Sequence, residues 1–497
     1  MNSGLQGSRD RFDRSRQTAG MFLGPAAFLA VLVSPTGLEP STHRLAAIFA
    51  LVVVFWITEA IPLPATALLG PALAVVVGVA GAREAFASFG HPIIFLFLGS
   101  FLIARAMMKH GLDRRIALFV LSRPWVGEHP GRILLAFGAI AAFLSMWMSN
   151  TATTAMMLPI GLGVLRTLPL GGRDDAGEPS STYATGLMLM IAYSCNVGGI
   201  ATPVGTPPNL IAIGMLEKVL NRDISFVEWM SFGLPVAVVC FVFLYAFVRR
   251  RFCPNAGAID GAAAVIRGER TKLGKWRAGE KAALTAFLVA ITLWMLPGVV
   301  GLVVGSESLA TKTLSGALPE GASAILAATL LFLIPVDWKS REFALDWNEA
   351  ARIDWGTILL FGGGLSLGGL AFSTGLAEAI GGAALGEAGA LGIAAMVLIA
   401  IFVANIMTEF MSNTAMANLL IPMFLALAAA GAGGSMLPAL GATLGCSLAF
   451  CLPVATPPNA IVYGSGRVPL TAMIRTGVVL DLGCGLLTWA GLLVFAR

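Results

Sequence analysis

The stretch Ser149-Asn150-Thr151-Ala152 occurs a second time as Ser412-Asn413-Thr414-Ala415, and this repetition decides how the chain is organised. A second motif follows each copy, Thr206-Pro207-Pro208-Asn209 in the first half and Thr456-Pro457-Pro458-Asn459 in the second. A hydroxyl residue stands four positions before each repeated serine, at Ser145 and Thr408. Two unlike motifs that recur in the same order in each half indicate an internal duplication.

The composition is that of a membrane protein. Of 497 residues, 57% are hydrophobic and only 12% are charged, whereas soluble domains carry roughly 25% charged residues. The 58 glycines and 26 prolines are typical of packed and broken transmembrane helices. The net charge of +5 comes from basic residues in loops between apolar stretches. Membrane topology explains these residues better than nucleic-acid binding does, so no nucleic-acid partner is expected. The six cysteines show no paired spacing, and we interpret them as buried small side chains.

Apolar stretches of the length that a membrane span needs follow one another along the chain. They lie at 21–34, 44–60, 64–82, 91–109, 133–168, 183–217, 228–249, 281–304, 321–335, 355–377, 390–430, 437–465 and 474–495. Two of them, 133–168 and 390–430, are too long for one helix and hold the Ser-Asn-Thr copies, so each is predicted to form a re-entrant hairpin. The prolines of the second motif should break the helices at 183–217 and 437–465. The prediction is an all-α polytopic membrane protein with about eleven spans and two hairpins.

The basic residues predict the orientation. Residues 1–19 are polar, contain four arginines and lack a signal-peptide pattern, so we expect a cytoplasmic tail. With this end inside, most loop Lys and Arg residues also fall inside, whereas the outer loops at 305–320 and 378–389 contain only Lys312. The predicted parts are a first repeat with an N-terminal span at 20–250, a cytoplasmic linker at 251–280 and a second repeat at 281–497. Each repeat has five spans, and an odd number inverts the second copy.

Hairpin tips and unwound helices expose backbone groups that a continuous helix would pair. Half-helix N-termini offer N–H donors and a positive dipole end, which suit an anion, whereas unwound carbonyls suit a small cation. Neither motif contains Arg, Lys or His. A dianion bound there therefore needs another positive charge, which bound sodium would supply. Inverted repeats, broken helices and a site at mid-membrane are typical of a secondary transporter.

Four charged residues lie in or at the ends of apolar stretches: Glu59, Arg105, Glu409 and Asp481. Charges inside a membrane are functional candidates, and Glu409 stands out because it follows Thr408 directly. A structural role in the hairpin, or a place at a dimer interface, is the alternative for Glu409. No HExxH, paired-histidine or Gly-x-Ser-x-Gly motif occurs, so an enzyme is not expected. An anion channel is a further alternative, but two occluding hairpins favour alternating access.

The paired Ser-Asn-Thr tips and Thr-Pro-Pro-Asn breaks resemble those of the divalent anion/sodium symporter family, whose members carry C4-dicarboxylates, citrate or sulfate. The resemblance covers nearly the whole chain after the N-terminal tail. It implies a homodimer in the cell membrane, here a bacterial inner membrane, with a scaffold domain and an elevator-type transport domain in each subunit. The transport domain would comprise both hairpins, both broken spans and the span that follows each of them.

The same resemblance implies the site residues. One sodium ion would be bound by Ser145, Ser149, Asn150 and the carbonyl of Gly205, and a second by Thr408, Asn413 and the carbonyls of Met411 and Ala455. The substrate carboxylates would be held by Asn150, Thr151, Asn413 and Thr414, with Thr206, Pro207, Thr456 and Pro457 closing the pocket. In family members that prefer citrate, the sequence of the second tip resembles Ser-Asn-Val. Thr414 therefore favours succinate, malate or fumarate, co-transported with Na⁺. Sulfate symport, citrate symport and sodium-independent dicarboxylate exchange stay open as alternatives.

Overall fold

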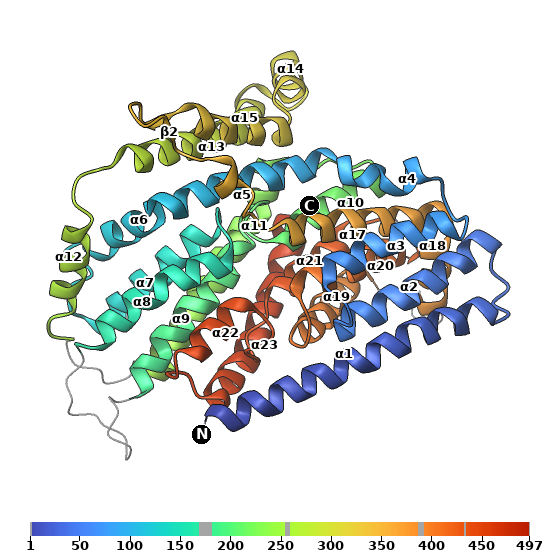
Figure 1. The fold of residues 1–497 in the computed structure, drawn as a ribbon, viewed down its shortest axis with the longest axis horizontal. Coiled ribbons are helices and arrows are strands. Elements are labelled where there is room, and N and C mark those ends of the chain that lie inside the picture. The colour runs from blue at the N-terminus through green and yellow to red at the C-terminus, as the bar shows by residue number, and fades with distance from the viewer. Residues whose placement is uncertain (1, 168–180, 254–258, 386–391, 432–433, 497) are drawn as a thin grey trace.

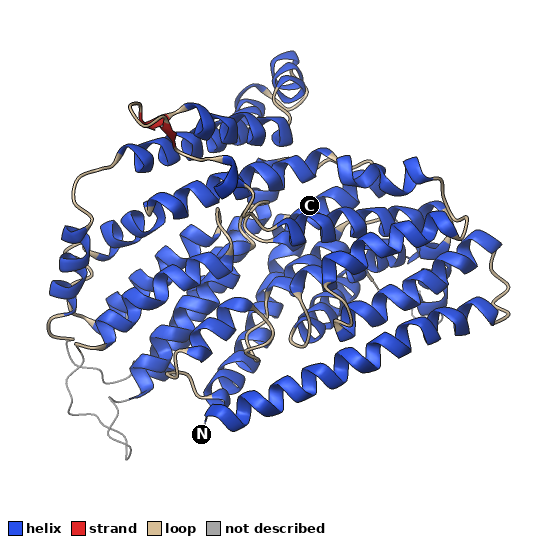
Figure 2. Ribbon diagram, viewed as in Figure 1, coloured by secondary structure: helices blue, strands red, loops and turns tan. Residues whose placement is uncertain are grey.

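The structure, a computed structural model, describes residues 2–167, 181–253, 259–385, 392–431 and 434–496. Nearly all of them are helical (Figure 2). The helices before the central linker are α1 (Asn2–Val33), α2 (Pro40–Thr58), α3 (Leu63–Val76), α4 (Ala82–Ala87), η1 (Ser88–Gly90), α5 (Pro92–His110), α6 (Leu112–Leu121), α7 (Pro130–Ser145), α8 (Asn150–Leu165), α9 (Ser181–Gly199), α10 (Pro207–Leu220) and α11 (Phe226–Phe252).

The linker helix α12 (Ala262–Lys272) leads into the second half. The remaining helices are α13 (Ala278–Val304), α14 (Leu309–Ala317), α15 (Glu320–Leu333), α16 (Trp347–Ala350), α17 (Trp355–Ser373), α18 (Leu376–Leu385), α19 (Ile393–Thr408), α20 (Asn413–Gly431), α21 (Leu437–Ser447), α22 (Pro457–Gly464) and α23 (Leu470–Phe495). The strands of the described residues are a short antiparallel pair, β1 (Pro335–Asp337) and β2 (Glu342–Phe343).

The predicted all-helical membrane architecture is confirmed. Among the described residues, seven helical stretches are long and apolar enough to cross a membrane: α1 from Arg14, α2, α4 with α5, α11, α13, α17 and α23. The pair α14–α15, bent by 54°, passes the same test together. The other predicted spans fall on α3, which has 14 residues, and on the broken pairs α9–α10 and α21–α22. The total of eleven spans stays a prediction.

Each duplicated motif lies where one helix stops and another begins. The first hairpin stretch folds as α7 and α8, and Ser149 is the N-cap of α8. The second folds as α19 and α20, which begins at Asn413. The proline motifs separate α9 from α10 and α21 from α22. Pro207 and Pro457 are the first residues of α10 and α22, where a proline costs nothing because the first N–H groups of a helix have no internal partner.

The two halves pack against each other reciprocally. Motif order makes α3 the counterpart of α15, and α5 the counterpart of α17. Helix α5 packs on α15, and α3 packs on α17. Close to the motifs, α8 contacts α22 whereas α20 contacts α10. The helices α9, α11, α21 and α23 run between an edge formed by α1 and α2 and an opposite edge formed by α13 to α15 (Figure 1).

Several predicted connections contain helix. Residues 2–19 of the predicted tail are the first part of α1, which no proline interrupts before Pro25. The predicted linker, 251–280, contains α12, whose Arg114–Glu269 ion pair at 2.5 Å ties it to α6. The predicted outer loop at 378–389 begins within α18, and its remainder lies outside the described residues. Most of the predicted loop at 169–182 lies outside them as well.

Candidate functional site

The tips of the two hairpins contain the same internal hydrogen bond. Ser145, the last residue of α7, donates its hydroxyl to Oδ1 of Asn150, the first residue of α8. Thr408, the last residue of α19, donates to Oδ1 of Asn413 at 2.6 Å. Both hydroxyl residues are fully buried, whereas the two asparagines are half-buried. Each tip therefore brings two of the predicted site residues together at the start of a helix.

The asparagine of each Thr-Pro-Pro-Asn motif holds the helix break open. Nδ2 of Asn209 donates to the carbonyls of Gly199 at 2.9 Å and Thr202 at 2.8 Å. Nδ2 of Asn459 makes the equivalent bonds to the carbonyls of Ala449 and Leu452, both at 3.1 Å. These carbonyls have lost their helical partners, and one side chain in each half replaces them. This role was not predicted from the sequence, although the repetition of the asparagine was a signal for it.

Gly199 lies between Asn150 of the first tip and Gly205 of the first break. A Cβ atom on Gly199 would lie 2.8 Å from Oδ1 of Asn150 and 3.3 Å from the carbonyl oxygen of Gly205. The missing side chain lets the two oxygens approach the same point. The predicted ligands Ser145, Asn150 and Gly205 are thus neighbours. In the second half, the Thr408 hydroxyl lies 3.1 Å from the carbonyl oxygen of Cys446 on α21, which ties that tip to its broken helix.

Three other predicted sodium ligands are less closely connected. Ser149 is exposed, and its side chain makes no capping hydrogen bond. Met411 and Ala455 are buried. Within the described residues, neither forms a hydrogen bond with Thr408 or Asn413.

The predicted substrate residues lie at helix N-termini. Thr151 and Thr414 are half-buried in the first turns of α8 and α20. Thr206 and Thr456 are buried N-caps of α10 and α22, each followed by its proline, half-buried Pro207 and exposed Pro457. The first N–H groups of α8 and α20 lack internal partners and carry partial positive charge, so these two ends suit carboxylate oxygens. Helices α10 and α22 begin with two prolines, which have no N–H group, so their first turns offer the threonine hydroxyls instead.

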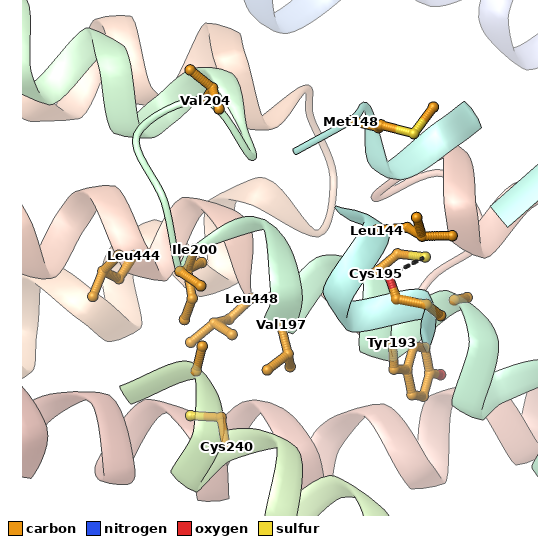
Figure 3. Packing of buried hydrophobic residues seen from close by; sticks show 14 of the residues in the cluster. Leu144, Met148, Tyr193, Cys195, Val197, Ile200, Val204, Cys240, Leu444 and Leu448 are labelled. Carbon is orange, nitrogen blue, oxygen red and sulfur yellow. Dashed lines mark hydrogen bonds between the residues drawn. The ribbon is translucent and has the colours of Figure 1, made fainter. Parts of the chain in front are cut away.

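Contacts between the halves join the first broken helix to the second break. The hydroxyl of Tyr193 on α9 donates to the carbonyl of Phe450 at 2.7 Å. Nδ2 of Asn196 donates to the carbonyl of Ala449 at 3.2 Å and approaches Oγ1 of Thr456 at 3.4 Å. Around these bonds, buried apolar side chains of α7, α9 and α21 pack together (Figure 3). The two breaks therefore belong to one core.

The charged residues singled out from the sequence fall into two groups. Glu59, the C-cap of α2, pairs with Arg16 of α1 at 3.2 Å, and Arg105 of α5 pairs with Glu349 on α16, so both form ion pairs between helices. Glu409 and Asp481 meet near the second break. Sγ of Cys451 donates to Asp481 at 2.8 Å, and ligand atoms of Glu409, Cys451 and Asp481 all lie within 4.8 Å of one another. The meeting of these three residues could not be foreseen from the sequence.

The chain is similar to known transporters. Residues 18–494 match the family described as sodium:sulfate symporter transmembrane region. The sodium-dependent dicarboxylate transporter SdcS of Staphylococcus saprophyticus is 35% identical over 471 residues, which cover 94% of this chain and 89% of that protein. SdcS of Staphylococcus aureus (strain NCTC 8325) is 33% identical over 472 residues, covering 94% and 88%.

Two solved structures share the fold. The YdaH transporter of Alcanivorax borkumensis has a TM-score of 0.55 at 15% identity, covering 86% of this chain and 89% of that one. MtrF of Neisseria gonorrhoeae has a TM-score of 0.52 at 13% identity, covering 93% and 96%.

Proposed function

This chain belongs to the sodium:sulfate symporter family, and we propose that it is a sodium-coupled symporter of C4-dicarboxylates such as succinate, malate and fumarate. It is a multi-pass membrane transporter rather than an enzyme. The observation that carries the proposal is the duplicated pairing of a hairpin tip with a helix break. In both halves, a buried hydroxyl and an asparagine oxygen meet at the start of a helix.

The tips offer ligands of the kind that sodium prefers. The Ser145 hydroxyl, Oδ1 of Asn150 and the carbonyl of Gly205 are neutral oxygens gathered around Gly199. We infer that they bind one Na⁺ together with Ser149. The symmetry-related ion is bound by Thr408, Asn413 and the carbonyls of Met411 and Ala455. Neutral oxygen donors suit a small hard cation, and their low charge keeps the ion exchangeable.

The substrate dianion binds between the two tips in this proposal. Asn150, Thr151, Asn413 and Thr414 present amide and hydroxyl groups from the first turns of α8 and α20. Thr206, Pro207, Thr456 and Pro457 close the pocket. The helix N-termini attract the carboxylates, and the two sodium ions compensate their charge. The dianion therefore binds well only when sodium is present, which is the physical basis of coupling.

Two observations favour a dicarboxylate over sulfate or citrate. Thr414 provides a hydroxyl at the second tip, whereas the second tip of citrate-preferring family members resembles Ser-Asn-Val, with valine in place of this threonine. The two SdcS relatives, which cover nearly the whole chain, are named as sodium-dependent dicarboxylate transporters. The names describe those proteins, and we extend them to this chain because the tips and breaks agree.

For the transport movement, we propose an elevator mechanism in a homodimer. The transport domain would consist of α7–α11 and α19–α23, and the scaffold of α1–α6 and α13–α18. The reciprocal packing of α5 on α15 and α3 on α17 supports inverted repeats at 20–250 and 281–497. Ion pairs between α5 and the Asp346–Glu349 segment support a rigid scaffold. The N-terminus and the 251–280 linker would face the cytoplasm of a bacterial cell, with the chain in its inner membrane.

The test is uptake of radiolabelled succinate into proteoliposomes, with an inward Na⁺ gradient or with choline in its place. We expect uptake to need sodium and to be inhibited by malate and fumarate more than by citrate or sulfate. Equal uptake in choline, stimulated by preloaded dicarboxylate, would make the protein an exchanger. Transport of sulfate but not of succinate would overturn the assignment of a dicarboxylate as the substrate.

A matched pair of variants tests the second sodium site. Thr408→Val removes the hydroxyl but keeps the shape of the side chain, whereas Thr408→Ser keeps the hydroxyl. A hydrogen-bonding group that faces a charge contributes roughly 1.5–3 kcal/mol. We therefore expect Thr408→Val to raise the half-saturating Na⁺ concentration by about 10-fold or more. An equal response of the two variants would contradict the assignment of Thr408.

A further inference from the structure

The joint between each hairpin tip and the helix break beside it is formed by residues outside the repeated motifs. In the first half, the hydroxyl of Thr202 donates to the carbonyl oxygen of Met146. Met146 directly follows Ser145, and Thr202 is fully buried within the break. The carbonyl of Thr202 in turn accepts from Asn209 at 2.8 Å. One continuous chain of hydrogen bonds therefore runs from the proline motif to the tip.

In the second half, a carboxylate makes the joint. Glu409 directly follows Thr408, so its position corresponds to that of Met146. Its Oε1 accepts from the N–H groups of Phe450 at 2.7 Å and Cys451 at 2.9 Å, and its Oε2 accepts from the N–H of Leu452 at 2.9 Å. Leu452 precedes its proline motif as Thr202 precedes the first one. The same two positions are joined in both halves.

The direction of the hydrogen bonds is reversed between the halves. In the first, a break side chain donates to a tip carbonyl. In the second, a tip side chain accepts from break amides. The residues involved have nothing chemical in common, yet each connects a tip to a break at equivalent positions. This agreement points to a requirement for the joint rather than for a particular residue.

We propose that Thr202 and Glu409 are positioning residues that set the affinity for sodium by holding each tip against its break, without touching the ion. The inference rests on the proposed sodium sites, whose ligands come from both segments. Ser145 and Thr408 belong to the tips, whereas Gly205 and Ala455 belong to the breaks. Ligands on two separate segments form an ion site only if the segments are held within about 0.5 Å of the right separation.

The joints differ in strength. Glu409 makes three hydrogen bonds to backbone amides, whereas Thr202 makes one to a carbonyl. Hydrogen bonds to a carboxylate are stronger than those between neutral groups. A glutamine in place of Glu409 has a single acceptor oxygen, and its NH₂ group would face an amide N–H. Loss of the second joint should therefore have the larger effect.

The experiment compares purified Thr202→Val, Thr202→Ser and Glu409→Gln proteins with the wild type. Two quantities are measured: the half-saturating Na⁺ concentration for succinate uptake in proteoliposomes, and the Na⁺-dependent rise in melting temperature in detergent without substrate. Loss of a group that orients metal ligands typically costs 10–100-fold in affinity. We expect about a 10-fold increase in half-saturating Na⁺ for Thr202→Val, a larger one for Glu409→Gln, and rescue by Thr202→Ser.

Thr185→Val is the matched control. Thr185 is also a buried threonine of the first broken helix, and its hydroxyl donates to the carbonyl of Arg467 at 2.7 Å, away from both tips. This variant should lower the melting temperature equally with and without sodium and leave the Na⁺ dependence unchanged. If Thr202→Val and Glu409→Gln behave in the same way as the control, their role is only structural and the proposal fails.

The outcomes separate this proposal from the one on which it rests. If the melting temperature and the succinate uptake of the wild type are both independent of Na⁺, sodium coupling and the positioning role are overturned together. A wild type that responds to sodium, with unchanged half-saturation in both variants, would overturn the positioning role alone. If Thr202→Val does not fold, Glu409→Gln decides the same question independently in the second half.

Discussion

Replacing Gly199 by alanine should damage the proposed first sodium site while leaving the fold in place. The added Cβ would lie 2.8 Å from Oδ1 and 3.2 Å from Nδ2 of Asn150. Non-bonded heavy atoms are comfortable at about 3.5 Å, so the amide must retreat by roughly 0.5 Å or more. Because the neighbour is the end of a half-buried side chain, the protein can accommodate the methyl group. The proposed sodium site cannot accommodate the methyl group unless the Asn150 amide moves away from the ion.

The size of the effect follows from this displacement. A misplacement of 1 Å at a functional group can cost about 100-fold, so roughly half of that displacement should cost about 10-fold, or about 1.4 kcal/mol of sodium binding. The second half carries Ala449 at the equivalent position, fully buried. The second site already accommodates a methyl group, and we expect the variant to weaken one of the two proposed ions selectively.

The assay is the Na⁺ dependence of succinate uptake, supported by Na⁺-dependent melting. Gly199→Ala should show a half-saturating Na⁺ concentration about 10-fold above the wild type, with similar yield. In Gly163→Ala the new Cβ would meet only Cγ1 of Val265 at 3.7 Å, and this control should behave as the wild type. In Gly198→Ala the new Cβ would overlap the backbone of Ala142 on α7. We expect this variant to fold poorly, so it serves as the reference for a loss of structure. Unchanged half-saturation in a folded Gly199→Ala protein would refute the proposal that Asn150 binds the first sodium ion.

Three further predictions concern stability. Asn209→Ala and Asn459→Ala each remove two hydrogen bonds to break carbonyls, and each should cost about 1–3 kcal/mol, measured as a lower melting temperature in detergent; equal melting to the wild type would contradict this role. Arg115→Met should cost about 3–5 kcal/mol, because it leaves Glu280, whose side chain is 4% exposed, without its partner at 2.8 Å; the double variant with Glu280→Gln should recover part of the loss. Burial raises the pKa of Asp113 to about 6 from its usual 3.8, so the folded state binds this proton more tightly and stability falls as pH rises from about 4 to 6. Asp113→Asn should therefore gain up to about 3 kcal/mol at pH 7 but little at pH 4, and an equal gain at both values would exclude this cause.

Local patterns in the chain were sufficient to predict the hairpins and the breaks. A stretch such as 133–168 is too long for one span, and a polar tripeptide in its middle marks the turn. The bond between Ser145 and Asn150 joins residues five positions apart, so their spacing alone brings them close. The membrane setting follows from composition, because transfer of apolar surface out of water depends only on which residues are present.

Some helices and loops were beyond such patterns. Residues 2–19 are the first part of α1, and the linker contains α12. Neither segment carries an apolar run long enough to predict a helix from the sequence. Their neighbours stabilise them: Arg16 bonds Glu59 on the next helix, and Arg114 holds Glu269 of α12. An ion pair between segments that lie far apart in the chain leaves no periodic signal in either one.

By itself, the sequence determined that the chain spans a membrane, that it is duplicated and that two pairs of motifs lie at interrupted helices. The tertiary structure alone decided which of these interruptions meet. Thr202 reaches Met146 across 56 residues, Glu409 reaches Leu452 across 43, and Tyr193 reaches Phe450 across 257. Contacts of this kind depend on how helices cross and how deeply each one is buried, and those are properties of the packed chain rather than of any segment. The proposed site lies between segments, so the sequence could suggest candidate residues for it but could not show the bonds that hold the segments together.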